Sequence, residues 1–451
     1  MSERRVMLVK LDKPPGGPSH LSYSEPIGIC YIAAFLEQHG LDCRLTHLFQ
    51  HDADQALCRE IADYAPDVIG FSVRNFNLAA TQRAIATIRK SFPAIRIIAG
   101  GECITAQQWQ SVAALLDTDA LIIGDGESSL LAYGSGVSPD EIPGCAYRDQ
   151  DGIWHGARHD SGRIALAELP MMSRHGLPMN RYCSEAFPGK TYATMHTMRG
   201  CRYHCTFCHT AGRYAKVDTR TTSQILDEVA LLVREHSVEA IGMWDEDFFA
   251  YPKRVEQIAQ GLVDRGSPVE WQSFMKLTDL QKAPIRQLLP LLRRSGYVRA
   301  IIGLESFLPA TLRGYHKAGG TNVEELCRHL TDHGITLCPA YIIGAPHETA
   351  ADVAYGLERL GRLGVDHGIR MDLPFVQFIT PYPGTALFSE YLEQDLIFDP
   401  DWSHYDGEHV VVKSKCPADQ LLGLRDAFYA NFYGQSSESH DATTPSARLC
   451  G

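Results

Sequence analysis

The sequence predicts an α/β protein with two successive sheets: a doubly wound parallel sheet near the N-terminus, followed by a partial (β/α)6 barrel. In the first 135 residues, short apolar runs alternate with helical patterns of about 10–15 residues, which is typical of parallel βαβ units. The same alternation resumes at Thr191 and continues through six strand–helix units. In both kinds of sheet, ligands bind at the carboxyl ends of the strands, so functional residues are expected there.

Residues 1–140 are expected to form the first domain. Its strands are short apolar runs, and its first helix starts at Pro26 and is closed by Gly40, a residue suited to a helix C-terminus. The predicted strands are 5–9, 43–48, 67–73, 95–101 and 119–126, and the predicted helices are 26–40, 54–65, 77–91, 105–116 and 127–133.

Residues 141–190 are expected to be a connector, with a short hairpin in "GVSPDEIPGCAYRDQDGIWHG". The barrel is expected over 191–390, and a short C-terminal region with one helix (417–432) and a disordered tail over 391–451. The predicted barrel strands are 192–198, 239–244, 269–275, 299–304, 336–343 and 371–378, and the helices between them are 222–236, 253–264, 282–295, 322–334 and 350–363.

Composition excludes several classes of partner. The 451 residues carry a formal net charge of −12 without a dense Lys/Arg run, which argues against nucleic acid or an anionic membrane surface as the main partner. No apolar run approaches the roughly 20 residues needed to cross a bilayer, and the N-terminal apolar run is too short for a signal peptide. We therefore expect a cytoplasmic protein whose 13 cysteines are free thiols or metal ligands.

The stretch "RGCRYHCTFCHT" places Cys201, Cys205 and Cys208 in a Cys-x3-Cys-x2-Cys pattern directly after the first barrel strand. Covalent haem would use Cys205, Cys208 and His209, but it leaves Cys201 without a role and requires an export signal. Zinc would need His204 or His209 as fourth ligand, although structural zinc ligands usually come in two pairs from separate segments. A four-iron, four-sulfur (4Fe-4S) cluster on three thiolates fits best, and it leaves one iron open to another ligand.

This stretch resembles the signature of the radical S-adenosylmethionine (SAM) superfamily. The resemblance implies an enzyme in which the open iron binds SAM and electron transfer yields a 5′-deoxyadenosyl radical. It also implies SAM contacts along the barrel: the backbone around Phe207 for the adenine, "MWDEDFF" for the methionine ammonium, Lys276 for the carboxylate, and "IIGLES" for the ribose. The implied SAM-binding residues are Phe207, Asp245, Glu246, Lys276, Glu305 and Ser306, with Asp247 as a further candidate. Taken singly, each polar residue also fits a structural role such as a strand-end cap.

The whole layout resembles the cobalamin-dependent branch of these enzymes, through segments such as "EPIGICYIAAFLEQHG", "IIAGGE", "IIGDGE" and "TPYPGT". The resemblance implies a cobalamin-binding N-terminal sheet of Rossmann-like type. The residues expected to hold cobalamin are Ser72, Arg74, Asn75, Gly100, Gly101, Glu102, Gly124, Gly126 and Glu127. One feature departs from the pattern of many cobalamin proteins, because no Asp-x-His-x-x-Gly segment is present to supply an imidazole for cobalt.

The resemblance implies a methyltransferase that acts on an unactivated carbon of a small molecule or biosynthetic intermediate, with an electron donor such as a flavodoxin or ferredoxin. Rearrangement, cyclisation or alkyl transfer on the same scaffold is the alternative enzyme function, and a zinc- or cobalamin-binding regulatory module is the non-enzymatic one. Four residues are candidates for substrate contact: Tyr23, Glu25, His209 and Tyr382.

Overall fold

The computed structural model describes residues 4–13, 22–50, 53–157, 162–211, 217–317 and 322–436. The expected disordered tail, which begins at Gly434, lies outside these residues except for its first three residues, which are helical. The chain divides into two compact units. Unit 1 consists of the described residues of Met1–Pro14, Glu25–Met179 and Asp401–Ser403, and unit 2 consists of those of Pro15–Ser24, Asn180–Pro400 and His404–Gly451.

Unit 1 is built on a seven-stranded sheet of order β3-β1-β4-β5-β6-β7-β8. The first five strands in this order are parallel, as predicted. Their chain order is that of a doubly wound sheet whose order reverses between β1 and β4, where ligands of such sheets bind. The strands are β1 (Val6–Asp12), β3 (Cys43–Phe49), β4 (Val68–Ser72), β5 (Arg96–Gly100), β6 (Ala120–Ile122), β7 (Cys145–Arg148) and β8 (Trp154–His155).

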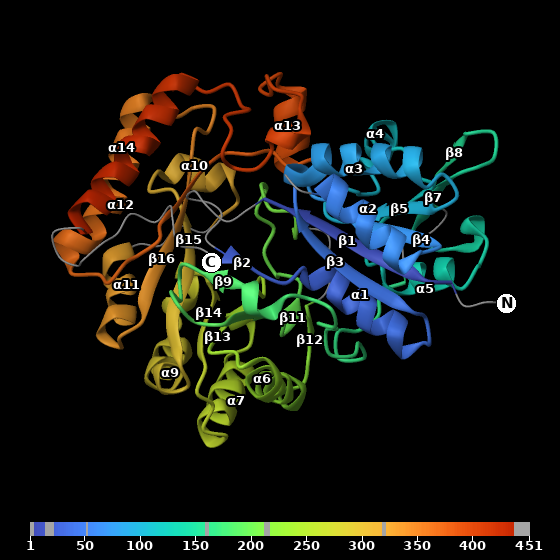
Figure 1. Cartoon of the computed structure of the whole chain (residues 1–451). Helices are drawn as coiled ribbons and strands as arrows, with labels where there is room; N and C mark the ends of the chain where they lie inside the picture. Colours follow the sequence, from blue (N-terminus) through green and yellow to red (C-terminus); the bar gives the residue numbers. More distant parts are fainter. Residues whose placement is uncertain are drawn as a thin grey trace. The chain divides into compact units, whose positions relative to one another are not determined.

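Helices cover both faces of this sheet (Figure 1). Because side chains alternate along a strand, Met7 and Val9 enter the core that includes Leu57 of α2 and Ile85 of α3, whereas Leu8 points to the opposite face. Helices α1 and α5 pack against each other and cover that opposite face. The helices are α1 (Ile27–Gln38), α2 (Ala53–Tyr64), α3 (Leu78–Ser91), α4 (Trp109–Leu115) and α5 (Glu127–Gly134).

The expected hairpin at the start of the connector is present as β7 and β8. It is part of the first sheet, because β7 pairs antiparallel with β6. The sheet is therefore mixed at this edge, and unit 1 extends to Met179 rather than ending near residue 140. Helix α4 is also shorter than the predicted 105–116, and it starts at Trp109.

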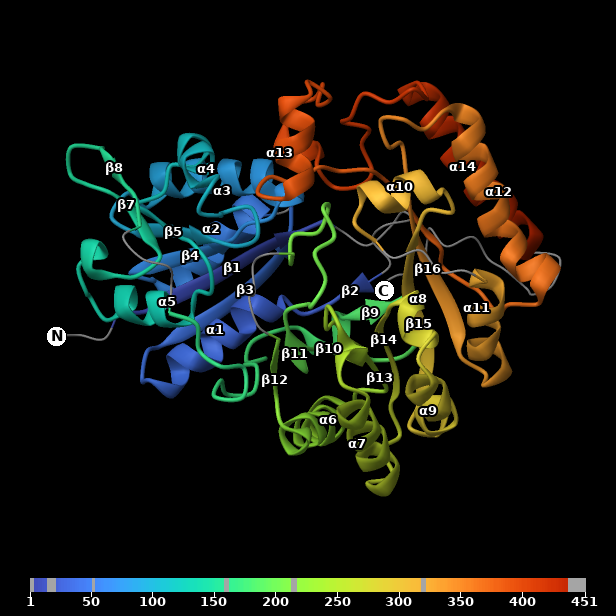
Figure 2. The ribbon, with the colours of Figure 1, turned by 180° about the vertical axis from the view of Figure 1, so that it is seen from behind.

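Unit 2 is built on a six-stranded parallel sheet whose order follows the chain, β10-β13-β14-β15-β16-β17. Its helices lie outside the strands, as expected of a partial barrel (Figure 2). The strands are β10 (Tyr192–Met195), β13 (Ala240–Met243), β14 (Glu270–Met275), β15 (Tyr297–Glu305), β16 (Thr336–Ile343) and β17 (Phe375–Phe378). The helices are α6 (Thr222–His236), α7 (Pro252–Asp264), α8 (Leu277–Leu280), α9 (Ala283–Arg294), α10 (Pro309–Gly314), α11 (Val323–Asp332), α12 (Ala350–His367), α13 (Ala386–Glu393) and α14 (Ala418–Ser436).

The helix ends of unit 2 follow local chemistry. Helix α6 begins after Thr221, whose hydroxyl accepts a hydrogen bond from the N–H of Gln224 while the Gln224 side chain accepts one from the N–H of Thr221. Helix α12 ends at Gly368, which has a φ of 62°. None of the helices in the described part of the chain is long and apolar enough to span a membrane.

Two predicted barrel strands differ from the structure. The sixth strand is only four residues long, because the chain turns at Leu373, which has a φ of 43°, and only a single bridge at Met371 precedes the turn. The first strand ends at Met195, and a separate two-residue strand, β11 (Met198–Arg199), follows it. The remaining short elements are β2 (Ser22–Tyr23), β9 (Cys183–Ser184), β12 (Asp218–Thr219), η1 (Asn75–Asn77), η2 (Pro139–Glu141), η3 (Met179–Arg181), η4 (Phe248–Ala250) and η5 (Trp402–His404).

Candidate active site

The three cysteines of the Cys-x3-Cys-x2-Cys pattern lie on one loop of unit 2. The loop follows β11, whose antiparallel pairing with β12 closes its base. Cys201, Cys205 and Cys208 are all half-buried, and the N–H of Cys208 donates a hydrogen bond of 3.1 Å to the carbonyl oxygen of Cys205. The pairing of β11 with β12 therefore fixes the start of the loop, and the hydrogen bond between Cys208 and Cys205 closes a turn within it.

These thiols have the donor chemistry of an iron-sulfur cluster. Within the part of the chain that the structure describes, no three His, Cys, Asp or Glu side chains are gathered tightly enough to hold a single metal ion. A four-iron cluster has a different requirement, since each thiolate binds a different iron and the sulfur atoms lie further apart. Three cysteines on one loop supply the thiolate donors that such a cluster takes.

Burial raises the pKa values of Cys201 and Cys205, while two lysines oppose this effect. Lys276 lowers the pKa of Cys201, and Lys317 lowers that of Cys205. Because thiolates, not thiols, bind metals, these two ammonium groups favour the ligand form of the cysteines.

Asp245, two residues after β13, is hydrogen-bonded to the segment that leads into the cysteine loop. It is fully buried, and its carboxylate accepts hydrogen bonds from the N–H of Thr197 at 2.6 Å, from the Thr197 hydroxyl, and from the N–H of Met198 at 3.0 Å. Burial raises the pKa of this carboxyl, and Arg254, 3.9 Å away, opposes the rise. Asp245 therefore holds the segment that leads into the loop, and its expected contact with methionine stays a prediction.

Glu246 and Lys276 meet near the loop. The Glu246 carboxylate accepts a hydrogen bond of 3.1 Å from the N–H of Gly200. The backbone carbonyl oxygen of Glu246 accepts one of 3.2 Å from the ammonium of Lys276. Lys276 also pairs with the buried Asp247 at 2.5 Å. Asp247 has a second cationic partner in Arg202, at 2.9 Å. The ammonium of Lys276 is thus fixed at the end of β14, within the reach of charge interaction with Cys201.

Glu305 and Ser306 end strand β15, where its pairing with β16 shifts in register. Glu305 has a φ of 60°, a conformation uncommon outside glycine, and its carboxylate pairs with Lys317 at 2.5 Å. The Ser306 hydroxyl accepts a hydrogen bond of 3.1 Å from the N–H of Leu308. Both residues are buried, so they lie in the interior of unit 2 at the end of β15.

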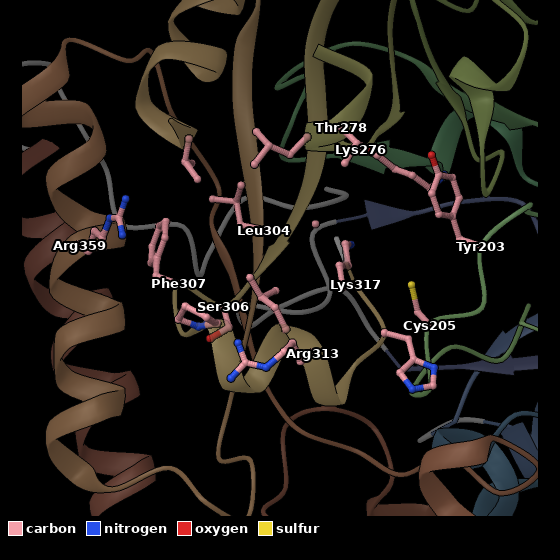
Figure 3. Close-up of a pocket in the computed structure, with 16 residues that line it drawn as sticks. Tyr203, Cys205, Lys276, Thr278, Leu304, Ser306, Phe307, Arg313, Lys317 and Arg359 are labelled. Carbon is pink, nitrogen blue, oxygen red and sulfur yellow. The ribbon is translucent and has the colours of Figure 1, made fainter. Parts of the chain in front are cut away.

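A cavity of about 330 Å³ joins several of these residues. Cys205 and Tyr203 lie at one end of it and Arg359 of α12 at the other (Figure 3). Lys276 and Ser306 also line it, so two of the six predicted SAM-binding residues share a cavity with a predicted cluster ligand. The tyrosine ring of Tyr203 lies 4.6 Å from the Lys276 ammonium and forms part of the wall.

Phe207 and the four candidates for substrate contact have different surroundings. The Phe207 ring packs edge-on against Tyr315 at 5.2 Å. His209 and Tyr382, from segments far apart in the sequence, bring their rings to 4.6 Å. Tyr23 is buried in β2 of unit 2. Glu25 belongs to unit 1, where its buried carboxylate pairs with Arg174 at 3.1 Å. His209 and Tyr382 thus form one cluster next to Cys208, whereas Glu25 is engaged within the core of unit 1.

The residues expected to hold cobalamin lie at the carboxyl edge of the unit 1 sheet. Ser72 ends β4, and Arg74 and Asn75 follow it, beside the point where the strand order reverses. Arg74 pairs with Glu102, which follows β5. Asn75 is buried, and its amide nitrogen has no hydrogen-bond partner among the described residues. This unmatched donor fits a ligand-binding edge.

Of two tightly packed glycines of this edge, Gly101 is required by the protein's own backbone packing, and Gly126 lies against the end of a flexible side chain. A Cβ on Gly101, which has a φ of 130°, would lie 2.2 Å from the carbonyl oxygen of Val73. A Cβ on Gly126 would lie 2.9 Å from the Ile32 side chain of α1. Gly100 and Gly124 are at neighbouring strand ends, and Glu127 is buried in the first turn of α5. Close approach of backbone to backbone therefore explains Gly101, and ligand contact there stays a prediction.

Several residues of the site were not identified from the sequence. Arg254 of α7 donates to the carbonyl oxygen of Thr197, and Lys317 pairs with Glu305. Asn77 is fully buried and donates to the carbonyl oxygens of Leu11 at 2.9 Å and of Ser72 at 3.1 Å, which joins β1 to β4. No spacing pattern links residues on separate elements, so these contacts carry no sequence signal.

Comparison with known families gives two matches. The model described as B12 binding domain matches residues 20–133. The model described as Radical SAM superfamily matches residues 195–360. The first match lies mostly in unit 1. The second covers the cysteine loop and four whole barrel strands, from β13 to β16, and it begins at the last residue of β10.

Relatives match nearly the whole chain at low identity. An uncharacterized methyltransferase of Pyrococcus horikoshii is 22% identical over 422 residues, which is 90% of this chain and 87% of the relative. The anaerobic magnesium-protoporphyrin IX monomethyl ester cyclase of Rubrivivax gelatinosus is 25% identical over 414 residues, covering 88% of this chain and 71% of the relative.

Solved structures share the fold. The radical SAM methyltransferase TsrM from Kitasatospora setae, with cobalamin and a [4Fe-4S] cluster bound, matches with a TM-score of 0.68 at 18% identity, covering 88% of this chain and 76% of that one. The cobalamin-dependent SAM radical enzyme OxsB, with aqua-cobalamin bound, matches with a TM-score of 0.73 at 16% identity, covering 98% and 70%. The two family matches, together with the cysteine loop, show that the chain is an enzyme of the radical SAM superfamily, in the group that carries a B12-binding domain ahead of the radical SAM core.

Proposed function

We propose that this enzyme is a cobalamin-dependent methyltransferase that acts on an unactivated carbon of a small molecule. The observation that carries the proposal is the shared cavity, because Cys205, Lys276 and Ser306 come from three separate elements and line one space. The B12-binding match, and the presence of methyltransferases among both the relatives and the structural neighbours, support cobalamin and methyl transfer.

The proposed cofactors are a [4Fe-4S] cluster, SAM and cobalamin. When bound, they supply a 5′-deoxyadenosyl radical and a methyl group for a carbon that has no nucleophilic lone pair. Cys201, Cys205 and Cys208 would hold the cluster as thiolates. The ammonium of Lys276, which Asp247 fixes from behind, would bind the SAM carboxylate as a point charge, and Glu305 and Ser306 would accept hydrogen bonds from the ribose.

The protein's own residues would also orient the substrate and keep water out. Tyr203 lies over Lys276 and forms a wall of the cavity next to Cys205. The paired rings of His209 and Tyr382 lie on the side of Cys208 and are the best-placed candidates for substrate contact. A low-potential electron donor such as a flavodoxin or ferredoxin would reduce the cluster.

For cobalamin, the unit 1 edge offers Ser72, Arg74 and Asn75 beside the reversal point of the sheet. No histidine occurs in the expected binding segments 72–77, 100–102 and 124–127, so we infer that no imidazole from these segments binds cobalt. His47, on β3, has a fully buried side chain that is hydrogen-bonded to Asp12 at 2.9 Å.

The test is anaerobic reconstitution with iron, sulfide and hydroxocobalamin, followed by desalting and metal analysis. About four irons and one cobalt per chain are expected for one cluster and one corrinoid. SAM should then be converted both to 5′-deoxyadenosine and to S-adenosylhomocysteine, which is the by-product of methyl donation. Loss of iron and of both products in the Cys201→Ala, Cys205→Ala, Cys208→Ala triple variant is expected, and retained SAM cleavage in that variant would contradict the proposal.

Cyclisation is the second candidate function, because cyclases occur among relatives that match most of the chain. A reaction without methyl transfer would give 5′-deoxyadenosine without S-adenosylhomocysteine. The ratio of the two products therefore separates the two functions.

A further inference from the structure

The cavity next to Cys205 has an unusual charge composition. Four of its sixteen lining residues are Lys or Arg, namely Lys276, Arg313, Lys317 and Arg359, and His316 adds an imidazole. None of the sixteen is Asp or Glu. The chain as a whole has 54 acidic residues against 42 basic ones, so this wall is opposite in sign to the rest of the molecule.

Three of the four cations form ion pairs with carboxylates that do not themselves line the cavity. Lys276 pairs with Asp247, Lys317 with Glu305 at 2.5 Å, and Arg359 with Glu324 at 2.7 Å. Each pair fixes a cation in place but leaves N–H donors unused, because an ammonium has three and a guanidinium five. The carboxylates therefore position donors around the cavity without supplying acceptors inside it.

Arg313, on α10, is the fourth cation. Within the described residues its guanidinium forms no ion pair, and no side-chain hydrogen bond of it is found. Its charge therefore faces no carboxylate partner among the described residues, while Lys317 and Arg359 each have one. The cavity carries an excess positive charge at this position, in the stretch between Lys317 and Arg359 (Figure 3).

The remaining wall is apolar, and it fixes one of the cations. The Arg359 guanidinium lies 4.4 Å from the centre of the Phe307 ring, a cation–π geometry that limits its movement. The apolar lining residues are Leu277, Leu304, Phe307, Pro309, Leu312 and Val323. A ligand of this space therefore needs an anionic group and an apolar body.

We propose that the substrate carries an oxyanion, a carboxylate or a phosphoryl group, which binds to Arg313, Lys317 and Arg359 in this cavity. SAM fits the stretch of Arg313, Lys317 and Arg359 less well, because its single carboxylate is accompanied by an ammonium and a sulfonium that three neighbouring cations repel. The inference rests on the proposed function, in which Lys276, at the other end of the cavity, binds the carboxylate of SAM. It narrows the substrate class to anionic small molecules.

The test measures binding of inorganic phosphate to the reconstituted full chain by titration calorimetry, with and without SAM. Wild type is compared with Arg313→Gln and Arg359→Gln, and with Arg328→Gln, which changes an exposed arginine of α11 outside the cavity. We expect Arg313→Gln and Arg359→Gln each to weaken phosphate binding about tenfold, the effect of one charge-assisted hydrogen bond. Arg328→Gln should bind like wild type.

Equal affinity in all four proteins, or equal loss in Arg328→Gln, would mean adventitious surface binding and would overturn the inference. Complete displacement of phosphate by SAM would assign the cations to SAM and overturn it as well. Circular dichroism checks that the variants fold; Arg313 is exposed, so Arg313→Gln should not perturb the core. If wild type binds phosphate at Arg313 but cleaves no SAM, the proposed function fails while the anion site stands.

Discussion

The guanidinium of Arg254 donates a hydrogen bond of 2.7 Å to the carbonyl oxygen of Thr197, four residues before the first cysteine of the loop. Arg254 is nearly buried and lies 3.9 Å from Asp245, which binds the N–H of the same Thr197. Arg254 thus binds the backbone carbonyl oxygen of Thr197, and Asp245 binds the backbone N–H of the same residue. Arg254 is therefore a positioning residue for the cysteine loop.

Arg254→Met should weaken this anchor. Removing one partner of a buried charge pair costs about 3–5 kcal/mol, so we expect the iron content after reconstitution to fall below about half of the wild-type value. Arg254→Lys should recover part of the iron, because it restores the charge with fewer donors.

The control is Arg299→Met, which breaks another arginine–carboxylate pair, between the buried Arg299 and the partly exposed Asp372, near the amino end of β15. It should lower thermal stability but leave iron per folded chain and the electron paramagnetic resonance spectrum of the reduced cluster unchanged. Equal loss of iron in both variants would show that Arg254 acts only through general stability.

Lys276→Met should weaken SAM binding. The variant removes the ammonium expected to meet the SAM carboxylate, and a charge-assisted hydrogen bond contributes about 1.5–3 kcal/mol, so the Kd should rise about tenfold or more. Equilibrium dialysis with labelled SAM measures this on the reconstituted protein. Lys253→Met, at an exposed lysine of α7, should leave the Kd unchanged. An unaltered Kd in Lys276→Met would remove this residue from the SAM site.

Gly101→Ala should destabilise the protein whether or not cobalamin is present. The new Cβ would meet the Val73 carbonyl at 2.2 Å in a backbone conformation that L-residues rarely adopt, so we expect a loss of at least about 2 kcal/mol. Gly152→Ala is the matched control, since it has a φ of 80° but open space around it, and it should cost about 1 kcal/mol. Thermal unfolding with and without hydroxocobalamin measures both. If Gly101→Ala keeps full stability but no longer binds cobalt, glycine is needed at this position for contact with cobalamin and not for packing.

Stability should depend on Asp12 at acid pH. Burial alone would raise the pKa of Asp12, but the Lys10 charge and the His47 hydrogen bond outweigh it and hold the pKa below its ordinary value of 3.8. A carboxyl whose pKa is lower in the folded state stabilises the fold above the unfolded-state pKa, and this contribution is lost as the pH falls below it.

Between pH 6 and pH 3, the Tm of wild type should therefore fall more steeply than that of Asp12→Asn, which has no carboxyl to protonate. Asp151→Asn, at an exposed position in the turn between β7 and β8, should follow wild type. Parallel curves for wild type and Asp12→Asn would show that the interactions of Asp12 with Lys10 and His47 do not contribute to stability.

Much of the fold could be predicted from the sequence because its signals are local. The strands of both sheets are short apolar runs, and helix ends such as those at Thr221 and Gly368 follow from one or two side chains or a single φ angle. The elements that differ, such as the shorter sixth barrel strand and the hairpin that joins the first sheet, depend on pairing partners far along the chain. Pairing of that kind leaves no periodicity in a single segment.

The sequence by itself determined the cysteine loop, since three ligands within eight residues need no tertiary contact to be recognised. It also determined that Lys276, Glu305 and Ser306 stand at strand ends. Only the tertiary structure decided that Arg254 anchors the loop, that Lys317 pairs with Glu305, and that a cationic cavity lies between Cys205 and Arg359. The physical reason is that charge pairs form between elements whose separation in sequence is arbitrary, so only packing of the helices against the sheet brings their charges within a few ångströms.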